Sequence, residues 1–341
     1  DFLQLVPQAT ADSLPPPAPQ PRVTKVTNEP EHRVLIPVGG GKDSAVSAEV
    51  IRGTVPINTF ILNPTPAELA VSQEAGCNTP VIVKRTLDPL LLELNKKGFL
   101  NGHVPFSASL AMMTVIAAEL GGYTDVVVSN ERSSNEGNVT YLGHEINHQY
   151  SKSLEFESDF TAYISDLSTV RYFSFMRPLY ELQIAKLFST FPQYFNIFRS
   201  CNRGQKTNTW CGACPKCLAI TLTLLPWVGA STISSIFGSN PLTRPENISL
   251  VHALAGLAET KPFECVTTKE ETLVSLHLCI QVYLQTGEPL PAVLADAQKN
   301  ILAQETNLEE RSQAVLEAWA SNPNTPSQFE ELLQAAYHEA V

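Results

Sequence analysis

The sequence predicts an α/β protein in which a doubly wound, mostly parallel sheet is followed by a cysteine-rich segment and a helical C-terminal region. Three observations predict this fold class. Short apolar runs alternate with helix-like patterns between residues 33 and 190, the first run leads directly into three glycines, and the strand pattern ends near residue 230. Alternation of β-branched runs with helical patterns is typical of parallel strands joined by crossover helices.

Five short runs rich in Val, Ile, Leu and Phe are predicted to form the strands of the sheet. They are nearly all apolar, as expected when helices cover both faces of a parallel sheet. Most are bounded by Gly, Pro or Asn, which interrupt regular structure. In chain order, the predicted strands are 33–38, 57–62, 81–83, 125–129 and 172–175.

Apolar residues recur at helical spacing between these runs, which predicts the crossover helices. The most apolar helical segment ends at Gly121-Gly122, and glycine is the preferred residue just beyond a helix C-terminus. In chain order, the predicted helices cover residues 44–51, 66–75, 90–97, 106–120, 153–165, 181–189 and 218–225.

The 341 residues suggest about two domains. Residues 1–32 contain a proline run and are predicted to be a Pro-rich, disordered linker. Residues 33–230 are predicted to form a nucleotide-binding domain that includes the cysteine segment 201–217, and residues 231–341 an acidic helical region. Because the chain opens on Asp1 without an initiator methionine, we expect a processed chain or a piece of a longer one.

The net charge of −11 is concentrated in the C-terminal region, where residues 231–341 carry 14 Asp and Glu against 5 Lys and Arg. An acidic chain without a basic face argues against wrapping a nucleic acid, although a few backbone amides can still hold a small anion. No stretch approaches the roughly 18 apolar residues of a membrane span, and no secretory signal is visible. We therefore expect a cytoplasmic protein without a nucleic-acid or membrane partner; for partner proteins the sequence makes no prediction.

The first predicted strand runs into the loop Gly39, Gly40, Gly41, Lys42, Asp43 and Ser44, followed by a helix. A doubly wound sheet binds phosphate at this position, because glycines let the backbone approach the ligand and helix N–H groups attract the anion. The loop matches neither the Walker A pattern, because Ile36 occupies the place of its first glycine, nor G-x-G-x-x-G, because Ser44 occupies the place of its third. A tight glycine turn without a ligand is the structural alternative.

The loop resembles the PP-loop, S-G-G-x-D-S, of ATP pyrophosphatases, with Gly39 in place of the first serine. A second likeness is Arg177-Pro178-Leu179, since a similar R-P-L follows a late strand in several PP-loop families. The resemblance implies an adenine-nucleotide alpha hydrolase-like, Rossmann-like fold and an ATP- and Mg²⁺-dependent reaction. It implies that Ser44 and the loop amides hold pyrophosphate, that Asp43 lies near Mg²⁺ and that Lys42 adds positive charge.

Four cysteines, Cys201, Cys211, Cys214 and Cys217, fall within seventeen residues and supply the usual ligand set of a closed structural zinc site. The intervening Gly212 and Pro215 allow the tight turns that such spacing needs. A [4Fe–4S] cluster, a redox C-x-x-C pair and buried free cysteines are the alternatives. The cluster is similar to one that binds zinc near the active site in the PP-loop family that makes the 7-cyano-7-deazaguanine precursor. The remaining cysteines, Cys77, Cys265 and Cys279, are interpreted as packed side chains outside the metal site.

Three polar segments, 101–105, 129–138 and 147–157, are placed where a parallel sheet presents the carboxyl ends of its strands. Ligands bind at that edge in such folds. Ordinary solvated loops are the alternative, but His, Arg, Lys and carboxylates are dense here in a chain with only 17% charged residues.

Several long strings, among them PVGGGKDS, VVVSNERSSNEGN, EINHQYSKSLEFE, RYFSFMRPLYELQIAKLF and WCGACPKC, resemble the UDP-N-acetylmuramoyl-L-alanyl-L-glutamate epimerases of bacterial peptidoglycan synthesis. The likeness covers roughly residues 33–268, and we expect this chain to lack a further N-terminal region of that family. It implies ATP-dependent epimerisation of the terminal L-glutamate of the UDP-linked muramoyl dipeptide to D-glutamate, with release of AMP and diphosphate.

Adenylating a carboxylate makes the neighbouring Cα–H acidic enough for one group to remove the proton and another to return it on the opposite face. Position in the polar segments makes His148, Lys152, Glu155 and Glu131 candidates for proton transfer. Arg132 and Arg177 are candidates for carboxylate or phosphate binding. Two alternatives stay open: another PP-loop enzyme, such as a 7-cyano-7-deazaguanine synthase-like or RNA-thiolating enzyme, and a non-catalytic nucleotide- or zinc-binding module.

Overall fold

The computed structural model describes residues 31–99, 105–260, 262, 264 and 266–340, and residues from Glu31 onward form one compact unit. The predictions made for the Pro-rich segment up to residue 30, for residues 101–104 and for Cys265 lie outside the described residues.

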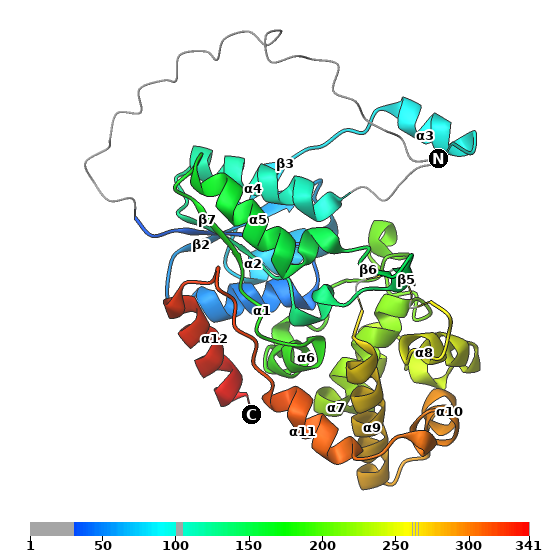
Figure 1. Ribbon diagram of the computed structural model, residues 1–341. Helices are drawn as coiled ribbons and strands as arrows, with labels where there is room; N and C mark the ends of the chain where they lie inside the picture. Colours follow the sequence, from blue (N-terminus) through cyan, green and yellow to red (C-terminus); the bar gives the residue numbers. More distant parts are fainter. Residues whose placement is uncertain (1–30, 100–104, 261, 263, 265, 341) are drawn as a thin grey trace, which may run out of the picture. The chain divides into compact units, whose positions relative to one another are not determined.

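A five-stranded, wholly parallel sheet forms the centre of the described chain (Figure 1). Its order is β3-β2-β1-β4-β7, so chain order reverses between β1 and β4. The five strands match the predicted ones and are β1 (Val34–Pro37), β2 (Ile57–Leu62), β3 (Val81–Val83), β4 (Asp125–Val128) and β7 (Arg171–Ser174). In a parallel sheet, such a reversal opens a crevice beyond the carboxyl ends of the two strands.

Helices cover both faces of this sheet, which explains why its strands are almost entirely apolar. Leu35 and Val126 join one core cluster with residues of α4 (Phe106–Gly121) and α5 (Leu154–Ser165). Their neighbours Ile36 and Val127 point to the other face and join a second core with residues of α1 (Lys42–Ile51) and α6 (Glu181–Ser189).

The predicted helices are confirmed, and residues at their ends form known helix-capping motifs. Thr65 and Glu68 form a capping box at the start of α2 (Pro66–Glu74). Gly122 ends α4 in the left-handed conformation with φ 68°. The helix α3 (Pro89–Lys96) also forms as predicted. A hairpin of β5 (Val139–Tyr141) and β6 (His144–Ile146) was not predicted, because its three-residue strands are too short and too exposed to show an apolar pattern.

The described part of the C-terminal region is helical, as predicted. Its helices are α7 (Pro215–Phe237), α8 (Ile248–Leu254), α9 (Lys269–Thr286), α10 (Ala292–Asn300), α11 (Leu308–Glu317) and α12 (Ser327–Glu339). The last helix returns to the sheet, because the Phe329 ring lies 5.1 Å from that of Phe173 in β7 and α12 contacts α1 (Figure 1). The domain boundary at residue 230 stays a prediction; it falls inside α7, which bends at Gly229 (φ 77°).

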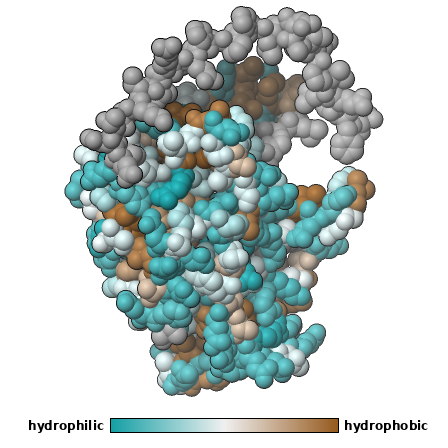
Figure 2. Space-filling view, turned by 60° about the vertical axis from the view of Figure 1, so that its left-hand side comes forward, coloured by the Kyte–Doolittle hydropathy of each residue, from teal (hydrophilic) through white to brown (hydrophobic). Residues whose placement is uncertain are grey.

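One helix corrects the expectation that no stretch approaches a membrane span. By length and composition α7 could cross a membrane, with a mean hydropathy of 1.5 over its most apolar 18-residue window. More than half of that window is buried inside the protein, and the core helix of a globular protein meets the same test. On the face seen in Figure 2, hydrophilic and apolar side chains are interspersed.

Candidate functional site

A cavity of about 380 Å³ opens where β1 and β4 end, at the reversal of strand order. Its wall combines residues from seven parts of the chain. They contribute Pro37, Gly39, Gly41, Asp43 and Ser44; Phe106, Ser107 and Leu110; Val128, Ser129, Asn130 and Glu131; Lys152 and Tyr172; and Arg199, Ser200, Cys201, Asn202, Gln205 and Lys216. Its lining combines polar and charged residues with apolar ones, among them Phe106, Leu110 and Tyr172.

The glycine loop forms one edge of the cavity, and two of its glycines are required by the structure. Gly40 has φ +74°, and a Cβ there would approach that of Ala67 to 3.2 Å. A Cβ on Gly41 would come within 2.6 Å of the Ser200 hydroxyl, so the loop and the segment around Ser200 are in close contact. The Arg199 N–H also donates to the Gly40 carbonyl at 2.7 Å. Gly39 has no described atom within 4 Å of the place a Cβ would take, which leaves its side of the loop open.

The charged residues of the loop have different surroundings. Asp43 lines the cavity, whereas the Lys42 side chain is only 2% exposed and forms ion pairs with Asp43 and Glu181. Lys216 approaches the same Glu181 carboxylate at 3.6 Å from the cavity side. The structure thus places the Lys42 charge behind the loop, between two carboxylates.

The electrostatics of this cluster favour the charged forms of Lys42 and Glu181 but disfavour that of Asp43. Burial acts to lower the pKa of Lys42, but Asp43 and Glu181 outweigh it and raise that pKa to about 12. Burial acts to raise the pKa of Glu181, but Lys42 and Lys216 lower it from 4.5 to about 2. Burial and the neighbouring Glu181 raise the pKa of Asp43. Because the folded pKa of Glu181 lies below its ordinary value, this carboxylate stabilises the fold above pH 4.5, and that contribution is lost as the pH falls toward 2.

Replacing Lys42 by methionine is expected to lower the free energy of unfolding by about 3–5 kcal/mol, because it leaves Glu181 buried without its nearest counter-charge. Denaturant unfolding followed by circular dichroism measures this. Lys96→Met on exposed α3 is the matched control and should change the stability little. Pairing Lys42→Met with Glu181→Leu should recover part of the loss; equal destabilisation by the two single methionine variants would contradict the ion-pair interpretation.

The candidates for proton transfer separate into two groups. Glu131 and Lys152 line the cavity together. His148 and Glu155 are not among the described residues that line it. The backbone N–H and ring Nδ1 of His148 both contact the amide oxygen of Asn138, and Glu155 is exposed on the first turn of α5.

The two candidate arginines also lie outside the described lining of the cavity. The Arg132 guanidinium lies 4.4 Å from the centre of the Tyr180 ring, and its backbone N–H donates to the Leu179 carbonyl. Arg177 is 1% exposed and donates to the backbone carbonyls of Glu131 and Lys152, at 2.9 and 2.7 Å.

One wall of the cavity was not predicted from the sequence. It consists of Arg199, Ser200, Asn202, Gln205 and Lys216. Their only signal in the sequence is that each lies within a few residues of the cysteine cluster, in or just after the string IFRSCNR or in CPKC. These residues could have been predicted only if the sequence had shown that the cysteine segment packs against the glycine loop.

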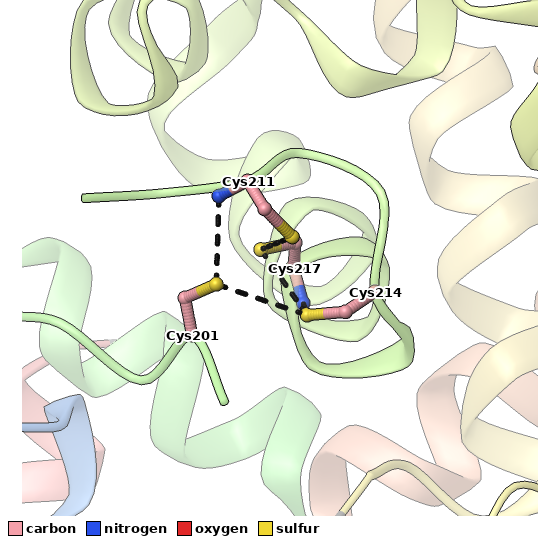
Figure 3. Close-up of side chains that lie close together, drawn as sticks. All are labelled: Cys201, Cys211, Cys214 and Cys217. Carbon is pink, nitrogen blue, oxygen red and sulfur yellow. Dashed lines mark hydrogen bonds between the residues drawn. The ribbon is translucent and has the colours of Figure 1, made fainter. Parts of the chain in front are cut away.

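The four clustered cysteines converge, as Figure 3 shows. All four sulfur atoms lie within 4.8 Å of one another, and the Cys201–Cys214, Cys211–Cys217 and Cys214–Cys217 separations are 4.0, 3.8 and 3.5 Å. Four thiolates at about 2.3 Å from one tetrahedral ion are about 3.8 Å apart, so this geometry fits a single zinc ion. A [4Fe–4S] cluster binds each thiolate to a different iron and holds the sulfurs farther apart.

Backbone N–H groups complete the surroundings of these sulfurs. Cys201 accepts from Gly204 and Cys211, at 3.2 and 3.4 Å, and Cys214 accepts from Cys217 at 3.4 Å. Such donors stabilise thiolates and orient metal ligands. Because Cys201 and Lys216 also line the cavity, the cysteine site forms the base of the unpredicted wall.

Two family models match most of the chain. One, described as the MurL N-terminal domain, matches residues 5–175, and one described as the MurL C-terminal domain matches residues 197–311.

Three curated relatives carry the name UDP-N-acetyl-alpha-D-muramoyl-L-alanyl-L-glutamate epimerase. The relative from Micromonospora sp. is 37% identical over 303 residues, which are 86% of this chain and 66% of the relative. Those from Salinispora tropica and Xanthomonas oryzae pv. oryzae are 37% and 36% identical, over 78% and 71% of this chain. The matches span 59% and 55% of these two relatives, so the chain covers less than two thirds of each of the three.

Proposed function

The chain belongs to the MurL family, and we propose that it epimerises the terminal L-glutamate of UDP-N-acetylmuramoyl-L-alanyl-L-glutamate to D-glutamate in an ATP-dependent reaction of peptidoglycan precursor synthesis. The observation that carries the proposal is the cavity at the strand reversal, which the glycine loop, Asp43, Glu131 and Lys152 line together. Four thiolates suit a reduced, cytoplasmic compartment, in which we expect the protein to act.

The first step we propose is activation of the glutamate α-carboxylate. A carboxylate oxygen attacks the α-phosphorus of ATP and diphosphate leaves, which gives an acyl adenylate. In this scheme Ser44 and the glycine loop bind the phosphates, and Asp43 supplies an oxygen ligand of the kind that Mg²⁺ prefers. Arg199 and Lys216, which line the same cavity, add positive charge, and the apolar lining residues Phe106 and Leu110 suit the adenine ring.

The second step is inversion at the now acidic Cα. One group removes the proton, the mixed anhydride stabilises the enolate, and a second group returns a proton to the opposite face. We propose Glu131 and Lys152 for these two parts, because they line the same cavity and come from different loops. Hydrolysis of the anhydride then releases AMP and the inverted product.

For the cysteine cluster we propose a structural zinc site. Cys201, Cys211, Cys214 and Cys217 would occupy all four positions of a tetrahedral ion and leave none for a catalytic water. Its part in the reaction is then to hold the segment around Ser200 and the start of α7 against the glycine loop.

The proposal predicts chiral inversion that depends on ATP and Mg²⁺. Incubation with the UDP-linked muramoyl dipeptide should yield D-glutamate after hydrolysis, and in deuterated water the product should carry deuterium at Cα. AMP and diphosphate should form only when that substrate is present; UDP-N-acetylmuramoyl-L-alanine is the matched control that lacks the glutamate. ATP consumption without the dipeptide would favour another PP-loop enzyme, and ATP binding without turnover a non-catalytic nucleotide-binding module.

A further inference from the structure

We propose that Arg177 and Asn322 are positioning residues that set the geometry of Glu131 and Lys152 in the cavity. This inference rests on the proposed function, because it assigns to the C-terminal segment a part in the same proton-transfer site. The residues concerned form one continuous, buried chain of contacts from the segment after α11 to the cavity wall.

Arg177 joins two loops that face each other. Its Nη1 donates to the Glu131 carbonyl at 2.9 Å and to the Ser134 hydroxyl at 2.9 Å, and its Nη2 donates to the Lys152 carbonyl at 2.7 Å. Ser134 also donates to the Lys152 carbonyl, at 3.1 Å. Because the guanidinium is rigid and planar, it determines how far the Glu131 and Lys152 backbones lie from each other.

Glu157 holds the guanidinium in this orientation. Its Oε2 accepts from Arg177 Nη2 at 3.0 Å, and both side chains are 1% exposed. Its other oxygen, Oε1, accepts from the Ser174 N–H at 2.9 Å and from Asn322 Nδ2 at 3.0 Å. A buried ion pair needs such additional hydrogen bonds, since every unsatisfied lone pair adds to its desolvation cost.

Asn322 comes from the C-terminal segment and is 3% exposed. Besides Glu157, it donates to the Ser174 carbonyl at 3.0 Å, so it bridges α5 and the end of β7. It lies beyond residue 311, where the second family match ends.

Contacts on both sides of Asn322 along the chain hold its segment in place. Gln183 donates to the carbonyls of Leu316 and Ala318, at 3.0 and 2.8 Å, and the Ala320 N–H donates to the Pro178 carbonyl at 3.1 Å. After it, the Phe329 ring packs against that of Phe173 in β7. These contacts hold the Asn322 amide beside the buried Glu157 carboxylate, to which it donates a hydrogen bond as a neutral group.

Asn322→Asp is the sharpest test, because it keeps the shape of the side chain but places a second acid beside Glu157. We expect kcat for glutamate inversion to fall by about 10–100-fold with little change in the KM for ATP, since the glycine loop is not displaced. Asn300→Asp is the matched control: Asn300 is also a C-terminal asparagine that donates to a carboxylate, that of Asp296 at 2.6 Å, but it is exposed and distant in the fold. Arg177→Lys should lower kcat in the same manner, because a lysine cannot bridge both loops.

Hydrogen exchange separates this inference from the proposed function, because it requires no turnover. In Asn322→Asp, amides of residues 129–138 and 147–153 should exchange faster than in the wild type, whereas those of α2 should not change. An Asn322→Asp variant that melts at a lower temperature but keeps the wild-type kcat and the wild-type exchange of both loops would overturn the positioning role. If the loops loosen but the wild type shows no inversion, the proposed reaction fails and the contact network stands.

Discussion

Asp43→Asn is expected to reduce ATP-dependent turnover by about 10³-fold, equivalent to about 4 kcal/mol of transition-state stabilisation, while the fold is retained. Asp43 is the carboxylate of the glycine loop that lines the cavity, and asparagine keeps its shape but removes the charge that Mg²⁺ prefers. Lys42 keeps its buried partner Glu181 in this variant, so the ion pair beneath the loop survives. The steady-state rate of AMP release, measured across a range of Mg²⁺ concentrations, gives the effect.

Asp159→Asn, on the exposed side of α5, is the control with the same change of charge and should retain full activity. The melting temperature of Asp43→Asn should stay close to that of the wild type. Retention of more than a tenth of the wild-type rate at saturating Mg²⁺ would contradict the assignment of Asp43 to the metal.

Cys214→Ala is expected to remove the metal and, with it, most of the activity. Cys214 is fully buried, its sulfur lies 3.5–4.0 Å from two other cysteine sulfurs, and it caps the N-terminus of α7. Structural zinc contributes about 10–16 kcal/mol to the folding of small zinc-finger peptides; in a protein with its own large core we expect a loss of at least about 3 kcal/mol. Because Cys201 and Lys216 line the cavity, loss of the ion should also displace the cavity wall.

Metal analysis of the purified protein measures this directly, with about one zinc per chain expected for the wild type and almost none for Cys214→Ala. Cys279→Ala is the matched control, because Cys279 is equally buried in α9 but lies outside the cluster and contacts the Leu222 carbonyl. Unchanged zinc content in Cys214→Ala would refute the ligand set. Iron with acid-labile sulfide in the wild type would refute the choice of metal.

The sheet and its helices could be predicted because each leaves a local pattern. Both faces of β1 and β4 are buried, so each is a short, mostly apolar run, and such runs alternate with helical periods along the chain. The hairpin 139–146 could not be predicted, because its residues are mostly exposed and no apolar alternation marks them.

The sequence predicts those parts of the candidate site that lie just beyond the ends of the strands. Glu131 lies shortly after the end of β4, and the glycine loop shortly after the end of β1, so the parallel topology brings them together. His148 is a candidate for the same reason as Lys152, yet only Lys152 is among the described residues of the cavity wall, whereas His148 contacts Asn138. The sequence of a loop has no periodic pattern, so the direction of its side chains cannot be predicted from it.

The amino-acid sequence is sufficient to establish the α/β class, the position of the glycine loop and the clustering of four cysteines, because these depend on spacing between near neighbours in the chain. Only the tertiary structure decides which residue pairs with each buried charge or amide. Lys42 is buried against Glu181, 139 residues away, and Asn322 reaches Glu157 across 165 residues. Such contacts arise because burying a charge or an amide is costly unless a partner compensates it, and that partner comes from whichever segment packing brings within reach.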